Sequence, residues 1–192
     1  MPLVLTAGPA VEPVTLAEAK AHLRVDGTAE DTLIASLIVT SRLHAEAAAG
    51  LALITQSWST FLDAWPPGPH LKLPLRPVQG IDAVRLYNEA GAATIVPPET
   101  YLLDSASAPS RLVRQGALAW PTPGRIANGI EIAFTAGYGD AAADVPAPIR
   151  QAILLLVAHW YEHRSPLEVG AQAQPIPGMV SDLLGPYRTM RL

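Results

Sequence analysis

The residues with the clearest capacity for chemistry lie at His159-Trp-Tyr-Glu162-His163. This stretch matches the H-x-x-E-H pattern of one class of zinc proteases. Two histidines four residues apart share one face of a helix and could hold a metal ion. Together with Glu162, the two histidines would support a zinc-dependent hydrolase.

A catalytic zinc site usually needs a third protein ligand, and the sequence offers little for that role. Downstream of the motif only Glu168 and Asp182 are acidic, in a tail rich in proline and glycine. A five-residue pattern also arises easily by chance. The alternative places both histidines at the edge of an apolar helix face and leaves Glu162 in solvent. We favour this alternative and predict no catalytic, metal-binding or cofactor-binding residues.

Other candidate motifs also favour structural roles. Gly137-Tyr-Gly139 is not a phosphate-binding loop, because G-x-x-x-x-G-K-[ST] is absent from the chain. The two glycines are expected to permit a tight turn between a strand and a helix. Serine and histidine residues occur, but no G-x-S-x-G pattern does. The sequence therefore contains no convincing active site.

Composition limits the classes of partner. The chain has 192 residues, of which 49% are hydrophobic, so we expect one domain, or one domain with an insertion, with a real core. The formal net charge of −4 gives no general basic field for gripping nucleic acid. There are no cysteines, which excludes disulfides and thiolate metal sites. The longest uncharged apolar run, residues 151–158, is far shorter than the ~20 residues of a membrane span. We therefore expect a soluble protein without a membrane partner, and the N-terminus shows no signal-peptide pattern.

One long helix, predicted over residues 146–164, organises the rest of the chain. Its apolar residues recur at helical spacing and form one continuous face. They are Ile149, Ala152, Ile153, Leu156, Val157 and Trp160. The other side mixes polar residues with Leu154, Leu155 and Tyr161. A helix that is apolar on nearly all sides is buried on nearly all sides, so we predict these three residues at a subunit interface.

The remaining pattern predicts a mainly α protein with a β-rich insertion, within the α+β class. Helices are expected over residues 15–24 and 29–49, the first opened by a capping box at Thr15 and Glu18 and the second ended by Gly50. Short strands separated by turn residues are expected between about residues 52 and 136, with a hairpin-like connection at Asn88-Glu-Ala-Gly91. We predict a small helical bundle over residues 1–164, built from two N-terminal helices, the inserted strands and the long central helix.

The C-terminal tail changes character. Residues 165–178 are rich in proline, glycine, alanine and glutamine, which favours a flexible linker. A short amphipathic segment follows and ends at Gly185-Pro186. We predict a flexible C-terminal arm over residues 165–192. The arm either docks on another protein or packs on its own domain, and the sequence leaves both alternatives open.

Several stretches, in their order and spacing, resemble the head–tail connector (adaptor) family of long-tailed phages, prophages and gene transfer agents. They are Val14-Thr-Leu-Ala-Glu-Ala-Lys-Ala-His-Leu-Arg24, Gln56-Ser-Trp58, Leu73-Pro-Leu-Arg-Pro-Val78, Phe134-Thr-Ala-Gly-Tyr-Gly139, the helix from Ala152 to Arg164, and Leu183-Leu-Gly-Pro-Tyr-Arg188. The resemblance covers almost the whole chain. The family has no catalytic motif, and its pattern places His159 to His163 at the ordinary end of its long helix.

The resemblance implies a structural role. Such connectors form a ring, usually of twelve subunits, under the portal protein of the DNA-filled head. The ring extends the channel for double-stranded DNA, without sequence-specific binding, and docks a stopper or another downstream neck or tail protein. Carried onto this chain, the portal-binding arm would use Met179, Val180, Leu183, Leu184, Tyr187 and Arg188. The expected location is the neck of the virion, and the host cytoplasm before assembly.

Two alternatives remain beside the connector. A tail-completion or tail-terminator protein would be another ring-forming component of the same particle. The zinc-dependent hydrolase built on His159, Glu162 and His163 is the second. The order of two helices, a β block and a long helix favours the connector, because tail-completion and terminator proteins are mostly β.

Overall fold

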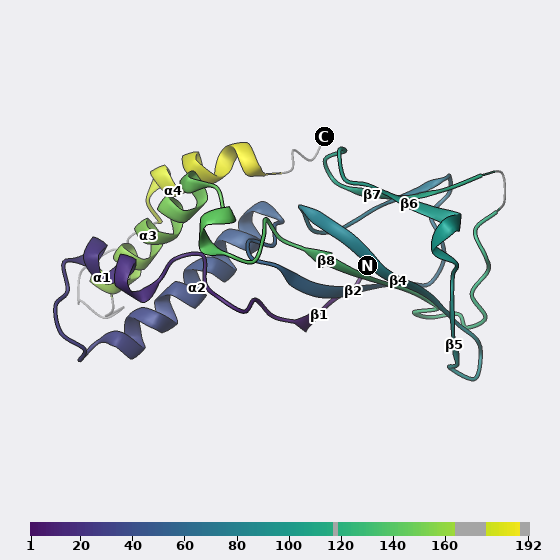
Figure 1. The fold of residues 1–192 in the computed structure, drawn as a ribbon, viewed down its shortest axis with the longest axis horizontal. Helices are drawn as coiled ribbons and strands as arrows, with labels where there is room; N and C mark the ends of the chain where they lie inside the picture. Colours follow the sequence, from purple (N-terminus) through teal and green to yellow (C-terminus); the bar gives the residue numbers. More distant parts are fainter. Residues whose placement is uncertain (117–118, 164–175, 189–192) are drawn as a thin grey trace, which may run out of the picture. The chain divides into compact units, whose positions relative to one another are not determined.

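The chain folds into two compact units, shown as a ribbon in Figure 1. The computed structural model describes residues 1–116, 119–163 and 176–188. The β unit comprises Met1–Pro9 and Thr55–Tyr138. The helical unit comprises Ala10–Ile54 and Gly139–Leu192. Each unit is therefore assembled from segments that lie far apart in the sequence.

A five-stranded antiparallel sheet is the centre of the β unit. Its strands, in spatial order, are β1 (Leu3–Ala7), β2 (Gln56–Leu62), β8 (Ile130–Ala136), β4 (Val78–Tyr87) and β5 (Ala93–Ile95). The central strand β8 carries Ile130, Ile132 and Phe134, all with no exposed surface. Their spacing of two residues places them on one face of the sheet. This face forms the core of the β unit.

A second, three-stranded antiparallel sheet completes the β unit. Its spatial order is β3 (His70–Lys72), β7 (Arg111–Arg114) and β6 (Tyr101–Asp104). The middle strand contributes Leu112, which is fully buried, and Leu71 of β3 pairs directly with it. A single turn of 3₁₀-helix at Pro98–Thr100 leads into β6.

The connection between β4 and β5 is the hairpin that Asn88-Glu-Ala-Gly91 predicts. The amide of Ala92 donates to the Asn88 side chain at 2.9 Å, and the amide of Gly91 donates to the Asn88 carbonyl at 2.9 Å. Gly91 adopts a φ of 81°, a left-handed conformation that glycine takes without steric cost.

The helical unit contains four α-helices among its described residues. They are α1 (Leu16–Leu23), α2 (Asp31–Ala49), α3 (Ala147–Glu162) and α4 (Gly178–Leu184). The predicted capping box of α1 is present, because Thr15 and Glu18 exchange side-chain and backbone hydrogen bonds. Gly50 ends α2 in a left-handed conformation, as predicted. Short 3₁₀ turns at Ala142–Asp144 and Gly185–Tyr187 precede α3 and follow α4.

The core of the helical unit forms where α2, α3 and α4 pack together, with α1 against α2 and α3. Its fully or nearly fully buried side chains include Ile34, Ile38, Ile149, Ile153, Leu156, Val180 and Leu184. The predicted apolar face of the long helix is confirmed for its first five residues. Trp160 lies near the C-terminal end of that face and is half-buried, with the centroid of its ring 5.7 Å from that of His44.

The prediction of a mainly α protein is wrong, because 34% of the described residues lie in helices and 27% lie in strands. The protein is an α+β fold with two antiparallel sheets. The expectation underestimated the strands because Leu3–Ala7, which lacks polar–apolar alternation, joins the sheet as β1. Its partner β2 is more than fifty residues away in sequence, so local pattern gave no sign of the pairing.

The other element predictions differ from the structure by a few residues. The helix predicted over 29–49 begins at Asp31, and no side chain caps it. The long helix runs from Ala147 to Glu162 after Pro146. Most of the predicted flexible linker lies outside the described residues. The division into a domain over 1–164 and an arm over 165–192 stays a prediction.

None of the helices in the described ranges combines the length and the apolar character needed to cross a lipid bilayer.

Candidate functional site

The two histidines of the H-x-x-E-H motif lie one helical turn apart at the end of α3. Their ring centroids are 4.7 Å apart, and Nδ1 of His163 lies 2.8 Å from the carbonyl oxygen of His159. Glu162 is exposed. Among the described residues no group of three or more potential metal ligands gathers anywhere. Glu168, one of the two acidic residues downstream of the motif, lies outside the described residues.

Leu154 and Leu155, predicted at a subunit interface, lie on the side of α3 that faces away from its buried residues. Both are half-buried. Tyr161 is also half-buried, and its hydroxyl donates a hydrogen bond to the carboxylate of Glu30. This contact ties the last turn of α3 to the residue that precedes α2. The side chain of Tyr161 therefore helps to stabilise its own unit.

The residues predicted for the portal-binding arm belong mainly to α4, which packs against α3 and α2. Val180 and Leu184 are 2% and 1% exposed, so they anchor α4 to the helical unit. Met179 is 61% exposed, Arg188 is exposed, and Leu183 and Tyr187 are half-buried. The segment therefore has an inner side that joins the core and an outer side that faces solvent.

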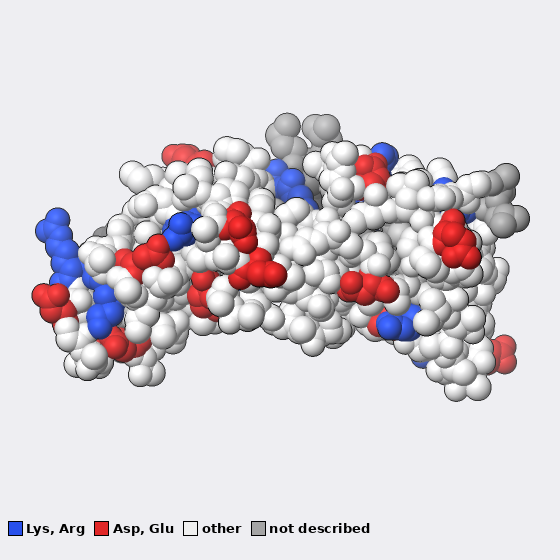
Figure 2. Space-filling view, in the orientation of Figure 1, with Lys and Arg blue, Asp and Glu red and all other residues white. Residues whose placement is uncertain are grey.

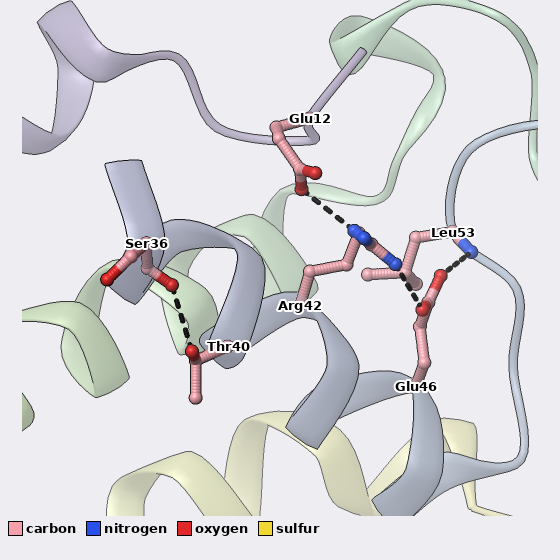
Figure 3. Close-up of polar contacts among 6 residues, drawn as sticks. All are labelled: Glu12, Ser36, Thr40, Arg42, Glu46 and Leu53. Atoms are coloured by element: carbon pink, nitrogen blue, oxygen red, sulfur yellow. Dashed lines mark hydrogen bonds and ion pairs between the residues drawn. The ribbon is translucent and has the colours of Figure 1, made fainter. Parts of the chain in front are cut away.

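A buried ionic cluster, which the sequence pattern did not predict, stabilises the helical unit (Figure 3). Arg42 of α2, only 6% exposed, donates from Nε to Glu12 and from Nη1 to Glu46, each at 2.8 Å. The second oxygen of Glu46 accepts a hydrogen bond from the amide of Leu53 at 2.9 Å. The cluster joins the segment before α1, the helix α2 and the chain that follows it.

Burial alone would lower the pKa of Arg42, but its bonds to Glu12 and Glu46 outweigh burial and raise it. The guanidinium therefore stays charged. A charge pair four residues apart in an otherwise apolar helix was the available signal for this cluster. Pairs at that spacing are common on exposed helix faces, and the pattern alone does not tell the two situations apart.

A second carboxylate, Glu131 of β8, organises polar contacts in the β unit. It accepts hydrogen bonds from Ser59 of β2 at 2.8 Å, from Tyr87 of β4 at 2.5 Å and from Arg85 of β4 at 3.2 Å. Burial raises its pKa, but these donors together lower it below the usual value. These hydrogen bonds all lie within the five-stranded sheet, so Glu131 links the adjacent strands β2, β8 and β4.

Charged side chains form no large patch of one sign on the side of the molecule shown in Figure 2. Acidic and basic groups are scattered among uncharged ones, in agreement with a net charge of only −4. A protein that grips nucleic acid strongly carries a clustered basic surface. This side of the molecule suits protein–protein contacts better than tight binding of phosphates.

Gly139, in the turn between β8 and α3, has a structural reason to be glycine. A Cβ atom at this position would collide with the carboxylate of Asp144. That carboxylate accepts a hydrogen bond from the amide of Ala141 at 2.9 Å, which shapes the entry into α3. The prediction that this glycine permits a tight turn is thus supported by a close contact.

Comparisons with known proteins were made for the sequence and for the fold. No protein-family model matches the chain, and no curated protein matches it either. Among solved structures, a chain from the neck of an empty gene transfer agent particle, computed with C6 symmetry, is 30% identical. The alignment covers 100% of this chain and 97% of that one, with a TM-score of 0.86.

Two further solved structures of gene transfer agent particles also contain a chain similar to this one. A chain from the virion of a native gene transfer agent particle is 29% identical over 100% of this chain and 97% of that one, with a TM-score of 0.85. A chain from the neck of a native gene transfer agent particle, computed with C12 symmetry, is 32% identical. The alignment covers 98% of this chain and 97% of that one, with a TM-score of 0.78. Similarity of this extent includes the sequence as well as the fold. The chain therefore belongs to the family of head–tail connector proteins represented in the necks of gene transfer agent particles.

Proposed function

We propose that this chain is a structural subunit that forms a closed ring with copies of itself, under the portal protein of a phage-like particle. The observation that carries the proposal is the full-length similarity to chains from particle necks. The structures of those necks were computed with C6 and C12 symmetry. A ring of twelve copies is compatible with both, because a twelve-fold ring also has six-fold symmetry.

The lumen of the proposed ring extends the channel for double-stranded DNA, and its far side docks a stopper or another downstream neck or tail protein. Contacts with phosphates increase affinity for DNA and would slow its passage. The net charge of −4 and the scattered charges in Figure 2 support a channel that DNA crosses without sequence-specific binding. The role requires no catalytic turnover and no cofactor.

The proposed contact with the portal lies on the outer side of α4 and the turn that follows it. Val180 and Leu184 would hold the helix on its own unit, while Met179, Leu183, Tyr187 and Arg188 would reach the portal. Replacing Met179 with Glu should abolish co-purification with the portal protein. Ile126→Glu, at a site 95% exposed in the β unit, is the matched control and should leave binding intact. Equal binding by both variants would refute this contact.

A tail-completion or tail-terminator ring is the alternative within the same particle. Full-length similarity to chains from necks favours the connector, since the neck joins the head to the tail. The protein would then be found in the neck of the virion, and in the host cytoplasm before assembly.

Deletion of the gene tests the function. We expect filled heads without tails, and restored particles when the wild-type chain is supplied in trans. Tailed particles that still deliver DNA in the absence of the chain would exclude a connector. Free heads together with unterminated tails of abnormal length would instead indicate a tail-terminator protein.

A further inference from the structure

The solvent-facing side of α2 carries no charge. Every residue of this 19-residue helix that is exposed is apolar, small or hydroxylated. These residues are Thr32, Ala35, Ser36, Val39, Thr40, Leu43, Ala47 and Ala48. We call them the uncharged α2 face. A helix of this length is about 28 Å long, and a surface helix normally presents charged and polar residues to water.

The arrangement of side chains within this face suits contact with another protein surface. Residues four apart lie on one side of a helix, so Ala35, Val39, Leu43 and Ala47 form a line along α2. Val39 is 37% exposed and Leu43 is 53% exposed. The small residues beside them would allow another helix to approach closely.

Two of the three hydroxyl groups of the face already donate hydrogen bonds within the helix. Ser36 donates to the carbonyl oxygen of Leu33 at 3.1 Å, and Thr40 donates to that of Ser36 at 2.8 Å (Figure 3). Burying a hydroxyl that has no partner would oppose association. Because these two donors are satisfied within the helix, this obstacle is absent for them.

The charged residues in the C-terminal half of α2 are covered by the protein itself. Arg42 and Glu46 are 6% and 8% exposed and form the ionic cluster with Glu12, whereas Leu43, next to Arg42 in sequence, faces water. The chain therefore buries two charges in this region and leaves a leucine outside. This is the arrangement expected if Leu43 becomes covered in an assembly.

A matching surface exists on the same unit. The side of α3 that faces away from the core carries Ala147, Pro148 and Gln151, all exposed, and the half-buried Leu154 and Leu155. It is uncharged from Ala147 to Leu155, apart from the half-buried Arg150 at its margin. Arg150 is engaged with Glu18 and the carbonyl oxygen of Pro13.

The helices α2 and α3 pack against each other, and each keeps an exposed face on the side away from its buried residues, so the unit carries two separate uncharged surfaces. This geometry fits a repeated contact between different surfaces of adjacent copies. Such contacts generate rings when the rotation between copies closes. We infer that the uncharged α2 face of one copy packs against the exposed side of α3 of the next copy in the ring.

The inference rests on the proposed ring and names the surfaces that join it. The occupant is a second copy of this chain for two reasons. Its α3 offers a complementary uncharged surface, and similar chains occur in particle necks whose structures were computed with C6 and C12 symmetry. DNA does not fit the uncharged α2 face, because affinity for DNA comes from Lys and Arg contacts with phosphates and the face has neither.

Cross-linking tests the contact cleanly, because the chain contains no cysteine. We would assemble particles with the double variant Leu43→Cys/Gln151→Cys and treat them with a short bismaleimide. The expected product is a ladder of dimers, trimers and higher multiples of the chain. Either single variant, and the control pair Leu102→Cys/Gln151→Cys with its partner cysteine in the β unit, should remain monomeric.

Each other outcome overturns the inference. A double variant that enters particles but stays monomeric would exclude the contact. Dimers from Leu43→Cys alone would mean that two α2 faces meet symmetrically, and a product containing a different protein would identify another occupant. Absence of the wild-type chain from particles would instead reject the proposed function itself.

A substitution supplies an independent readout. Leu43→Glu should lower incorporation into particles at least about tenfold. A tenfold loss corresponds to about 1.4 kcal/mol, which is a small part of the binding free energy of a protein interface. The control Leu102→Glu, at a position 41% exposed in β6, should leave incorporation unchanged. Thermal unfolding of both purified variants should match the wild type, because both side chains are exposed. Normal incorporation of Leu43→Glu would contradict the inference.

Discussion

Arg42 places a full positive charge inside the helical unit. Its guanidinium contacts Glu12 and Glu46, and Glu46 in turn accepts the amide of Leu53. A buried ion pair contributes little net stability compared with an apolar replacement of both partners. Removal of one partner is costly, however, because the other charge is left unpaired. Arg42 therefore matters mainly for how the N-terminal segment and the loop after α2 are fixed.

Arg42→Ala should lower the free energy of unfolding by about 3–5 kcal/mol. The measurement is urea denaturation followed by circular dichroism in the helical region. The double variant Arg42→Met/Glu46→Gln is the control, because it removes both charges of the pair and retains an acceptor for Leu53. It should recover part of the loss. A loss below about 1 kcal/mol for Arg42→Ala would show that the cluster is hydrated and unimportant.

Asp104 of β6 gives a second prediction at the scale of single residues. Hydrogen bonds from the Ser107 side chain at 2.7 Å and from Arg111 lower its pKa from 3.8 to about 2. A carboxyl group whose pKa is lower in the folded state stabilises that state when it is ionised. This contribution is complete above a pH of about 5 and is lost as the pH falls from about 4 towards 2.

Ser107→Ala should therefore raise the pKa of Asp104 towards its ordinary value, as measured by an NMR titration of the carboxyl group. In the same pH range, the difference in melting temperature between the wild type and Asp104→Asn should shrink as acid is added. An unchanged pKa in Ser107→Ala would mean that Arg111 and the backbone amide of residue 107 are enough to keep the pKa of Asp104 low.

At the scale of elements, α3 contributes most to the core of the helical unit. Its residues Ile149, Ala152, Ile153, Leu156 and Val157 are all fully buried. Its other side is largely half-buried or exposed and carries no charge between Ala147 and Leu155 apart from Arg150. The helix therefore has an inner face that builds the unit and an outer face that remains available to a neighbour.

Leu156→Ala should cost about 2–5 kcal/mol in the free energy of unfolding, the range for a buried leucine that leaves a cavity. Leu43→Ala, at a position 53% exposed, should change it by no more than about 0.5 kcal/mol. Denaturant unfolding of the two variants gives both values. Equal losses would mean either that α3 is not the core element or that Leu43 is already covered in the free protein.

The helix α4 decides a question that the sequence left open. Its buried Val180 and Leu184 show that the C-terminal segment packs on its own unit. The amphipathic pattern of residues 179–188 indicated two sides but did not say which protein the apolar side contacts. In the structure the inner side is taken by α3 and α2, so a portal contact would use Met179 and its outward neighbours.

At the scale of the whole molecule, local signals predicted elements and missed long-range pairing. The capping box at Thr15, the stop at Gly50 and the periodicity of α3 are short-range patterns, and each was found. The strand β1 pairs with β2 across more than fifty residues. No local pattern encodes such a contact, and its omission contributed to the incorrect mainly α assignment.

The sequence pattern indicated one of the two candidate surfaces, the outer side of α3, and did not indicate the uncharged α2 face. Leu154 and Leu155 were predicted at an interface because they interrupt a polar side in a strongly periodic helix, and their role there stays a prediction. The uncharged α2 face was missed because its small and hydroxylated residues look polar enough for a surface. One signal was available in the sequence, since no charged residue occurs between Asp31 and Arg42. Burial of Arg42 by a distant segment could not be deduced from sequence.

The central claim is that many copies of this chain form a ring between the head and the tail of a particle. The most direct test is electron microscopy of purified particles in which the chain carries a small fused label, with symmetry assessed at the neck. We predict label density in one ring, directly below the portal, with twelve-fold symmetry. Label at the distal end of the tail, or its absence from tailed particles that contain every other component, would contradict the account.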